Sequence, residues 1–183
     1  MTGQPNYNDR DHEPLILVII NAVGVENAIK QALHRAGYRT ISAEDDATGI
    51  SIAEKFAPHA VLLDTDLPDT TGYTICQELK SRLPTADIPI LFLTGLSPTE
   101  EVIRRCFDAG AHDLIVKPDD PSVDFGPFIT NLLSRIRVVL REQDLREAYR
   151  RLATQDLQTG LENRRQCFLR ISDAIVTSRR EKT

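Results

Sequence analysis

The sequence predicts an α/β fold in which a doubly wound, five-stranded parallel sheet carries helices on both faces and a long C-terminal helical extension. Short, continuous apolar runs that are typical of buried strands alternate with segments whose apolar residues recur at helical spacing. After Pro127 the pattern changes, because Phe128–Ala153 contains neither Gly nor Pro and reads as one helix. Strands that alternate with helices form right-handed crossovers, and these produce a parallel sheet.

The expected elements follow in chain order. The predicted strands are Leu15–Ile20, Tyr38–Ser42, Ala60–Leu63, Ile88–Leu93 and Leu114–Val116. The predicted helices between them are Val25–Ala36, Ala47–Phe56, Tyr73–Leu83 and Thr99–Ala109. Gly37 and Gly110 end the first and last of these helices.

The final helix, over residues 128–153, has two halves. Its first half carries an apolar stripe from Ile129 to Leu140, which we expect to pack on the sheet. A charged break over Arg141–Asp144 separates this stripe from Leu145, Tyr149 and Leu152. The second half has no core to cover, and we expect it to pair with a helix of a second copy in a homodimer.

Charge is unevenly distributed along the chain. Residues 1–127 carry a net charge of −10 and residues 128–183 a net charge of +5, which together give −5. Arginines of the tail alternate with acidic residues at helical spacing, so a solvated helix face explains them better than nucleic-acid binding does. We expect a mobile segment over residues 1–13, one compact domain over 14–127, a helical linker over 128–153 and the start of another domain over 154–183.

The sequence gives no sign of a membrane protein or of a disulfide framework. Cys76, Cys106 and Cys167 are widely separated and match no metal-binding spacing, so free thiols are the expectation. The apolar run Leu15–Ile20 is too short to cross a bilayer and has acidic residues before it, unlike a signal peptide. We expect a cytoplasmic protein.

Three polar residues stand where predicted strands end. Asp64 follows a buried run, Thr94 follows the next, and Lys117 follows the last. In open parallel sheets, function gathers at the carboxyl ends of the strands. A carboxylate, a hydroxyl and an ammonium at neighbouring strand ends suit phosphoryl transfer to the Asp, with the other two holding the phosphoryl oxygens. The alternative is a buried ion pair of Asp64 and Lys117 without chemistry.

The order and spacing of these residues resemble the receiver domain of two-component response regulators. The segment Val61–Gly72 places Asp64 four residues before Pro68 and eight before Gly72, Leu91–Gly95 places Thr94 before a small residue, and Ala109–Pro118 ends on Lys117-Pro118. The resemblance covers Leu15 to Pro127. It implies a flavodoxin-like sheet of strand order 2-1-3-4-5, phosphorylation of Asp64 by a histidine kinase or phosphotransfer protein, and a cis peptide bond before Pro118.

Two positions depart from the receiver pattern. Receivers usually end their first strand with two acidic residues that bind Mg²⁺ together with the acceptor Asp, and here these positions are Ile20 and Asn21. Asn21 offers one neutral oxygen and Asp66 could compensate, so we expect Mg²⁺ binding to be weak or absent. Leu114 stands at the switch position, where receivers usually carry an aromatic residue.

The tail resembles the opening segment of GGDEF domains, which are diguanylate cyclases. Asp156-Leu-Gln-Thr-Gly-Leu-Glu-Asn-Arg-Arg165 follows the pattern Asp-x-Leu-Thr-Gly-Leu-x-Asn-Arg-Arg with Gln158 in place of Leu. A helical hairpin broken at Thr159-Gly160 is the alternative. The GGDEF motif itself is absent from the chain, so we expect no enzymatic activity from these 183 residues.

These features lead to two functional hypotheses. In the first, the chain is a receiver that regulates a diguanylate cyclase output through dimerisation, without contacting nucleic acid or membrane. In the second, it is a pseudo-receiver that binds a protein partner or dimerises constitutively without phosphorylation. Ile20 and Leu114 motivate the second hypothesis.

Overall fold

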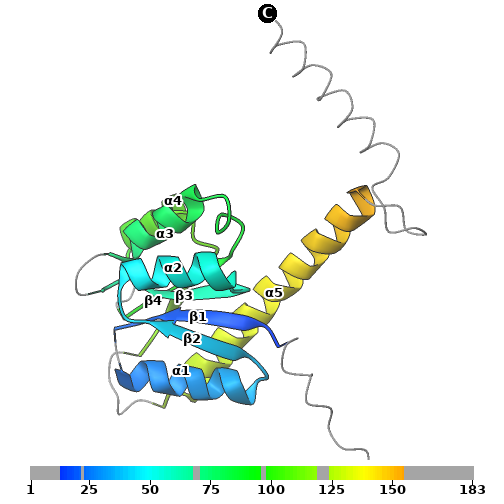
Figure 1. Cartoon of the computed structure of the whole chain (residues 1–183). Helices are drawn as coiled ribbons and strands as arrows, with labels where there is room; N and C mark the ends of the chain where they lie inside the picture. Colours follow the sequence, from blue (N-terminus) through cyan, green and yellow to red (C-terminus); the bar gives the residue numbers. More distant parts are fainter. Residues whose placement is uncertain (1–12, 22, 68–70, 96–97, 119–123, 155–183) are drawn as a thin grey trace, which may run out of the picture. The chain divides into compact units, whose positions relative to one another are not determined.

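The computed structural model describes residues 13–21, 23–67, 71–95, 98–118 and 124–154. Strands and helices alternate along the chain (Figure 1). The elements are β1 (Leu15–Ile19), α1 (Val23–Arg35), β2 (Arg39–Ala43), α2 (Asp46–Phe56), β3 (Ala60–Asp64), α3 (Gly72–Ser81), β4 (Ile90–Thr94), α4 (Glu100–Asp108), β5 (Asp113–Val116) and α5 (Gly126–Thr154). The expected segments 1–13 and 154–183 lie almost entirely outside the described residues.

The strands form one parallel sheet in the order β2-β1-β3-β4-β5. This confirms the predicted fold class and strand order. All five residues of β3 and all five of β4 are buried, as expected for central strands covered on both faces. The carboxyl ends of the strands therefore meet along one edge of the sheet, with β3 and β4 at its centre.

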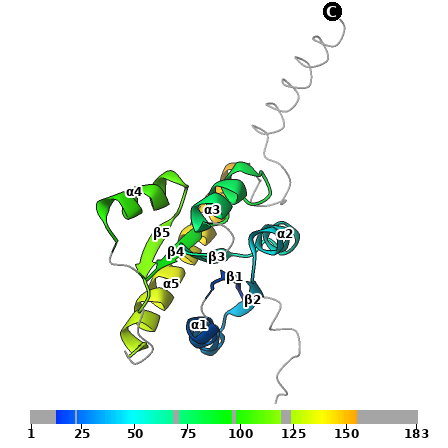
Figure 2. The same ribbon diagram turned by 90° about the vertical axis from the view of Figure 1, so that its left-hand side faces the viewer.

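Alternate strand residues divide the core into two clusters, one on each face of the sheet. One cluster joins the strands to α1 and the first half of α5. The other cluster joins them to α2, α3 and α4. Figure 2 shows these two helix layers with the sheet between them.

Several element ends lie one or two residues from their predicted positions. The third helix ends at Ser81 instead of Leu83, because Arg82 adopts an extended backbone (φ −100°, ψ 125°) shortly before Pro84. The fourth strand begins at Ile90 instead of Ile88, directly after Pro89, which has no N–H to donate to a strand ladder.

Capping chemistry explains where α2 begins. The Asp45 side chain accepts a hydrogen bond from the Thr48 backbone N–H at 2.7 Å, so Asp45 is the N-cap. Hydrogen bonds from the Thr48 backbone and hydroxyl hold the pKa of Asp45 below its usual value.

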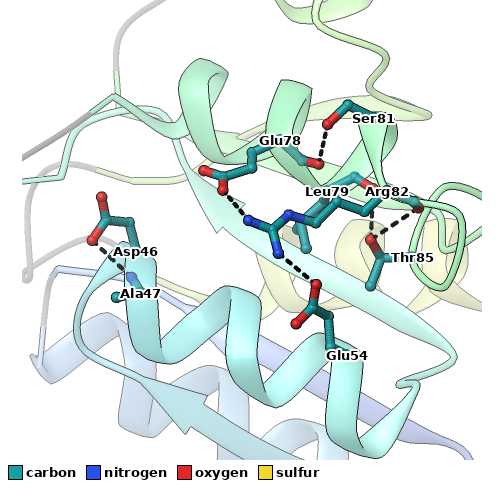
Figure 3. A network of polar contacts seen from close by, with 8 residues as sticks. All are labelled: Asp46, Ala47, Glu54, Glu78, Leu79, Ser81, Arg82 and Thr85. Carbon is teal, nitrogen blue, oxygen red and sulfur yellow. Dashed lines mark hydrogen bonds and ion pairs between the residues drawn. The ribbon is translucent and has the colours of Figure 1, made fainter.

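A polar network ties α2 to the end of α3 (Figure 3). Arg82 donates hydrogen bonds to Glu54 of α2, at 2.6 Å, and to Glu78 of α3, and these bonds raise the pKa of Arg82. The three side chains are each about two-fifths exposed, so solvent screens their attraction and the network adds little to stability. Below it, the buried Thr85 hydroxyl donates to the Leu79 carbonyl at 2.6 Å and closes the last turn of α3.

The two halves of α5 differ in burial, and the compact body that contains the sheet extends to Leu140. The first half of α5 buries Phe128, Leu132, Ile136, Val139 and Leu140, and the last four belong to the predicted stripe. In the second half, Leu145, Tyr149 and Leu152 are each at least half exposed. Among the described residues, no helix is long and apolar enough to span a bilayer.

The buried thiol of Cys76 predicts that the stability of the fold depends on pH. Burial raises the pKa of Cys76 to about 11, from an ordinary value near 9. Above pH 9 the unfolded chain releases this proton while the folded chain retains it, so stability falls as the pH rises from 9 towards 11 and is unaffected below pH 9. We expect the free energy of unfolding in urea to be about 1 kcal/mol lower at pH 10 than at pH 8. Cys76→Ala should reduce this difference, and an equal difference in both proteins would contradict the assignment.

Candidate phosphoacceptor site

Asp64 is the last residue of β3, and its side chain is only 1% exposed. β3 lies between β1 and β4, which places this carboxylate at the centre of the sheet edge. Burying an ionised carboxylate is costly unless a cation or hydrogen-bond donors compensate for its lost hydration. The structure supplies both kinds of compensation.

Lys117 supplies the cation. It directly follows β5, and its Nζ donates a hydrogen bond to Asp64 Oδ2 in a largely buried ion pair. Thr94 is 2% exposed and is the last residue of β4, the strand that lies between β3 and β5. The Lys117 backbone N–H donates to the Thr94 carbonyl at 2.8 Å and so fixes where the lysine side chain begins. The structure thus brings the three predicted residues to one place, as their strand ends implied.

The turn after β3 holds the other Asp64 oxygen. The Asp66 backbone N–H donates to Asp64 Oδ1 at 3.3 Å, and the Thr65 N–H donates to the Leu93 carbonyl at 2.9 Å. The Thr65 hydroxyl donates to Asp66 Oδ2, also at 3.3 Å. The Asp66 side chain itself is exposed.

Gly72, at the start of α3, packs directly against this turn. Its N–H donates to the Thr65 carbonyl at 3.2 Å. A Cβ added at Gly72 would lie 2.1 Å from the Asp64 carbonyl oxygen, which is far inside van der Waals contact. Sequence reasoning used Gly72 only as part of a motif. The structure shows that this position tolerates no side chain.

The oxygen donors that the sequence analysis suggested for Mg²⁺ are Asp64, Asp66 and Asn21. Ile20 is 7% exposed and packs in the core cluster beneath α1 and α5. Its surroundings are therefore apolar. Asn21 is exposed. Within the described ranges, no three His, Cys, Asp or Glu side chains lie close enough together to hold a metal. A weak Mg²⁺ site of two carboxylates and one amide oxygen therefore stays a prediction, and it would also need phosphoryl oxygens as ligands.

Leu114 occupies the expected switch position on β5, opposite Phe92 of β4, and is partly buried against the α2–α4 cluster. Its side chain has no hydroxyl to offer Thr94. The Tyr73 ring lies on the same face and contacts Phe92 with centroids 5.4 Å apart, a contact that sequence reasoning did not predict. The only signal for it was an aromatic residue directly after Gly72.

One expectation about this site is wrong. None of the described peptide bonds is cis, so the bond before Pro118 is trans. The trans form is intrinsically favoured by about 0.5–1 kcal/mol even before proline. Lys117 pairs with Asp64 across a trans bond, so the ion pair does not require the cis form.

Solved receiver structures share this fold. A putative response regulator from Chloroflexus aurantiacus superposes with a TM-score of 0.62 at 26% identity, covering 70% of this chain and 98% of that one. The receiver domain of the Pseudomonas aeruginosa sensor histidine kinase PA1611, with magnesium in its active-site cleft, gives a TM-score of 0.60 at 23% identity, covering 70% and 98%.

Curated relatives are similar over the same region. The DNA-binding dual master transcriptional regulator RpaA of Synechocystis is 35% identical over 131 residues, which cover 72% of this chain and 51% of that protein. The phosphate regulon transcriptional regulatory protein PhoB of Pseudomonas aeruginosa is 32% identical over 69% of this chain and 51% of its own length. The chain spans about half the length of these relatives. The response regulator receiver domain family matches residues 16–123, and the chain belongs to that family.

Proposed function

We propose that this chain is a phosphorylatable receiver module in which Asp64 accepts a phosphoryl group from a histidine kinase or phosphotransfer protein. The observation that carries the proposal is the buried Asp64 carboxylate paired with Lys117 beside Thr94. An ion pair that served only for packing would not need a hydroxyl at the intervening strand end.

The chemistry follows from these groups. A carboxylate oxygen of Asp64 attacks phosphorus, the P–N bond of the donor phosphohistidine breaks, and the imidazole leaves with the bonding electron pair and is protonated. The product is an acyl phosphate on Asp64. The Lys117 ammonium balances the charge on the phosphoryl oxygens and the Thr94 hydroxyl donates a hydrogen bond to one of them. Mg²⁺, when bound by Asp64, Asp66 and Asn21, supplies further charge neutralisation.

Asn21→Asp is expected to strengthen Mg²⁺ binding by about tenfold, because a second charged ligand joins Asp64 at an exposed position where a carboxylate costs little. Isothermal titration with MgCl₂ measures the affinity. Asn27→Asp is the matched control, since Asn27 is exposed on α1 and is not one of the proposed donors, so this change should leave the affinity unchanged. Equal affinities in Asn21→Asp and the unaltered protein would contradict this donor set.

A second candidate function is a phosphorylation-independent pseudo-receiver. The observation that favours it is Ile20, whose side chain belongs to the apolar core instead of the metal site. A pseudo-receiver would keep one oligomeric state whatever the phosphodonor, and it would keep that state in Asp64→Asn.

For the output, we propose regulated dimerisation through the exposed side chains of the second half of α5, Leu145, Tyr149 and Leu152. The segment 156–165 supports a GGDEF output, whereas the relatives RpaA and PhoB are transcriptional regulators. The similarity to those relatives covers the receiver region, and receivers occur with different outputs. A DNA output would give phosphorylation-dependent binding to duplex DNA in fluorescence anisotropy, and the cyclase hypothesis predicts none.

The test treats the purified protein with Mg²⁺ and acetyl phosphate and measures intact mass and solution mass together. We expect a phosphoryl adduct that is absent from Asp64→Asn and a shift from monomer to dimer. Leu145→Glu, on the exposed face of α5, should keep the adduct and lose the dimer. An adduct that persists in Asp64→Asn would overturn the assignment of the acceptor.

A further inference from the structure

Tyr73, in the first turn of α3, connects three elements on one face of the sheet. Its ring packs against Phe92 of β4 with centroids 5.4 Å apart. The Arg105 guanidinium of α4 lies 4.6 Å from the ring centroid, within range of a cation–π interaction. Burial raises the pKa of the Tyr73 hydroxyl, and the neighbouring Cys106 thiol of α4 adds to this shift.

The same residue is tied to the acceptor site through its neighbours. Gly72 packs so closely on the Asp64 carbonyl that no side chain fits between them, and its N–H donates to Thr65. Thr71 forms an isolated bridge with Asp66. A shift of the turn at Asp64–Asp66 therefore moves the first turn of α3, because close-packed backbones transmit displacement.

α4 is the helix on this face that is least anchored to the core. Of its residues, all of which the structure describes, Cys106 is the single buried one, whereas α3 buries four and α2 three. Ile103 and Phe107 of α4 are more than one-third exposed. Elements with few buried apolar contacts open and move most easily. Arg105, the neighbour of the buried Cys106 in α4, is the residue that packs on the Tyr73 ring.

We propose that Tyr73 transmits changes at Asp64 to α4, in place of the aromatic side chain that β5 lacks at Leu114. Leu114 has no polar group with which to follow a change at Thr94, while Tyr73 is joined to the acceptor turn through its neighbour Gly72 and contacts α4 through Arg105. The role rests on the proposed function only in that phosphorylation is the natural change at Asp64.

The test is a double-mutant cycle read by hydrogen exchange of the α4 amides in the full chain. Asp64→Asn removes the charge that Lys117 neutralises and so perturbs the site without a phosphodonor. We expect Asp64→Asn to change the exchange rates of the α4 amides by about threefold or more when Tyr73 is present and by less than about 1.5-fold in Tyr73→Leu. The effects of coupled residues are not additive, and this difference measures the coupling. Tyr73→Phe, which keeps the ring, should give an intermediate change.

Tyr38→Phe is the matched control, because Tyr38 packs in the cluster on the opposite face. It should leave the response of α4 to Asp64→Asn intact. The proposal is overturned if Asp64→Asn has no effect on α4, or if its effect is the same in Tyr73→Leu and Tyr73→Phe as in the unaltered chain. Adduct formation with acetyl phosphate is measured separately, so failure of phosphorylation and failure of coupling give different results.

Discussion

Lys117→Met is expected to lower the free energy of unfolding by about 3 kcal/mol at pH 7 and to abolish the phosphoryl adduct. The reason is that Asp64 is 1% exposed and Lys117 is the cation paired with it. Removing one partner of a buried ion pair leaves the other charge buried without compensation, which costs more than the pair itself contributes. Urea unfolding followed by circular dichroism measures the loss.

The control is the same substitution in a chain that already carries Asp64→Asn. Asparagine fills almost the same volume without the charge, so Lys117→Met should then cost about 1 kcal/mol or less. If the substitution costs the same in both backgrounds, Lys117 acts through packing of its stem, and the ion pair is not what stabilises the site.

Gly72→Ala is the second change with a large expected effect, a loss of about 3 kcal/mol. The new Cβ would lie 2.1 Å from the Asp64 carbonyl oxygen and 2.9 Å from the Phe92 ring. One of these contacts is with backbone at the acceptor, so relief requires α3 to move away from β3. Phosphorylation should slow as well, because the turn that positions Asp64 is displaced.

Gly24→Ala provides the comparison, measured by the same urea titration. Nothing lies within 4 Å of a Cβ added at Gly24, which is exposed in α1. Alanine is the better helix former, so this variant should be as stable as the original chain or slightly more stable. Similar losses at Gly24 and Gly72 would show that backbone freedom, and not close approach, explains the cost.

Most of the fold was predictable because apolar residues follow two patterns along the sequence. They form continuous runs in the buried strands and recur at helical spacing between them. The buried runs of β3 and β4 carry no polar residue before Asp64 and Thr94, so they identify central strands and mark where those strands end. Their position at the strand ends marked Asp64 and Thr94 as candidates for a functional site, and the resemblance to receivers supplied the roles proposed for them. The ends of helices and strands were less predictable, because Arg82 and Pro89 act through local backbone geometry that apolar periodicity does not contain.

What the sequence did not predict depends on contacts across the fold. The Tyr73–Phe92–Arg105 arrangement joins residues from three elements, and no spacing along the chain indicates that they meet. The trans bond before Pro118 is another example, because its isomer is set by tertiary context and not by the dipeptide. Ile20 was predictable in part. The sequence showed that an acidic residue is missing at this position, and the structure shows that the Ile20 side chain packs in the hydrophobic core.

The most direct test of the account is the intact mass of the protein after treatment with Mg²⁺ and acetyl phosphate, measured beside Asp64→Asn and with the solution mass of the same samples. The account predicts a phosphoryl adduct on the unaltered chain, none on Asp64→Asn, and a larger fraction of dimer only where the adduct forms. No adduct at saturating Mg²⁺ and phosphodonor, together with an unchanged oligomeric state, would contradict it and identify the chain as a pseudo-receiver.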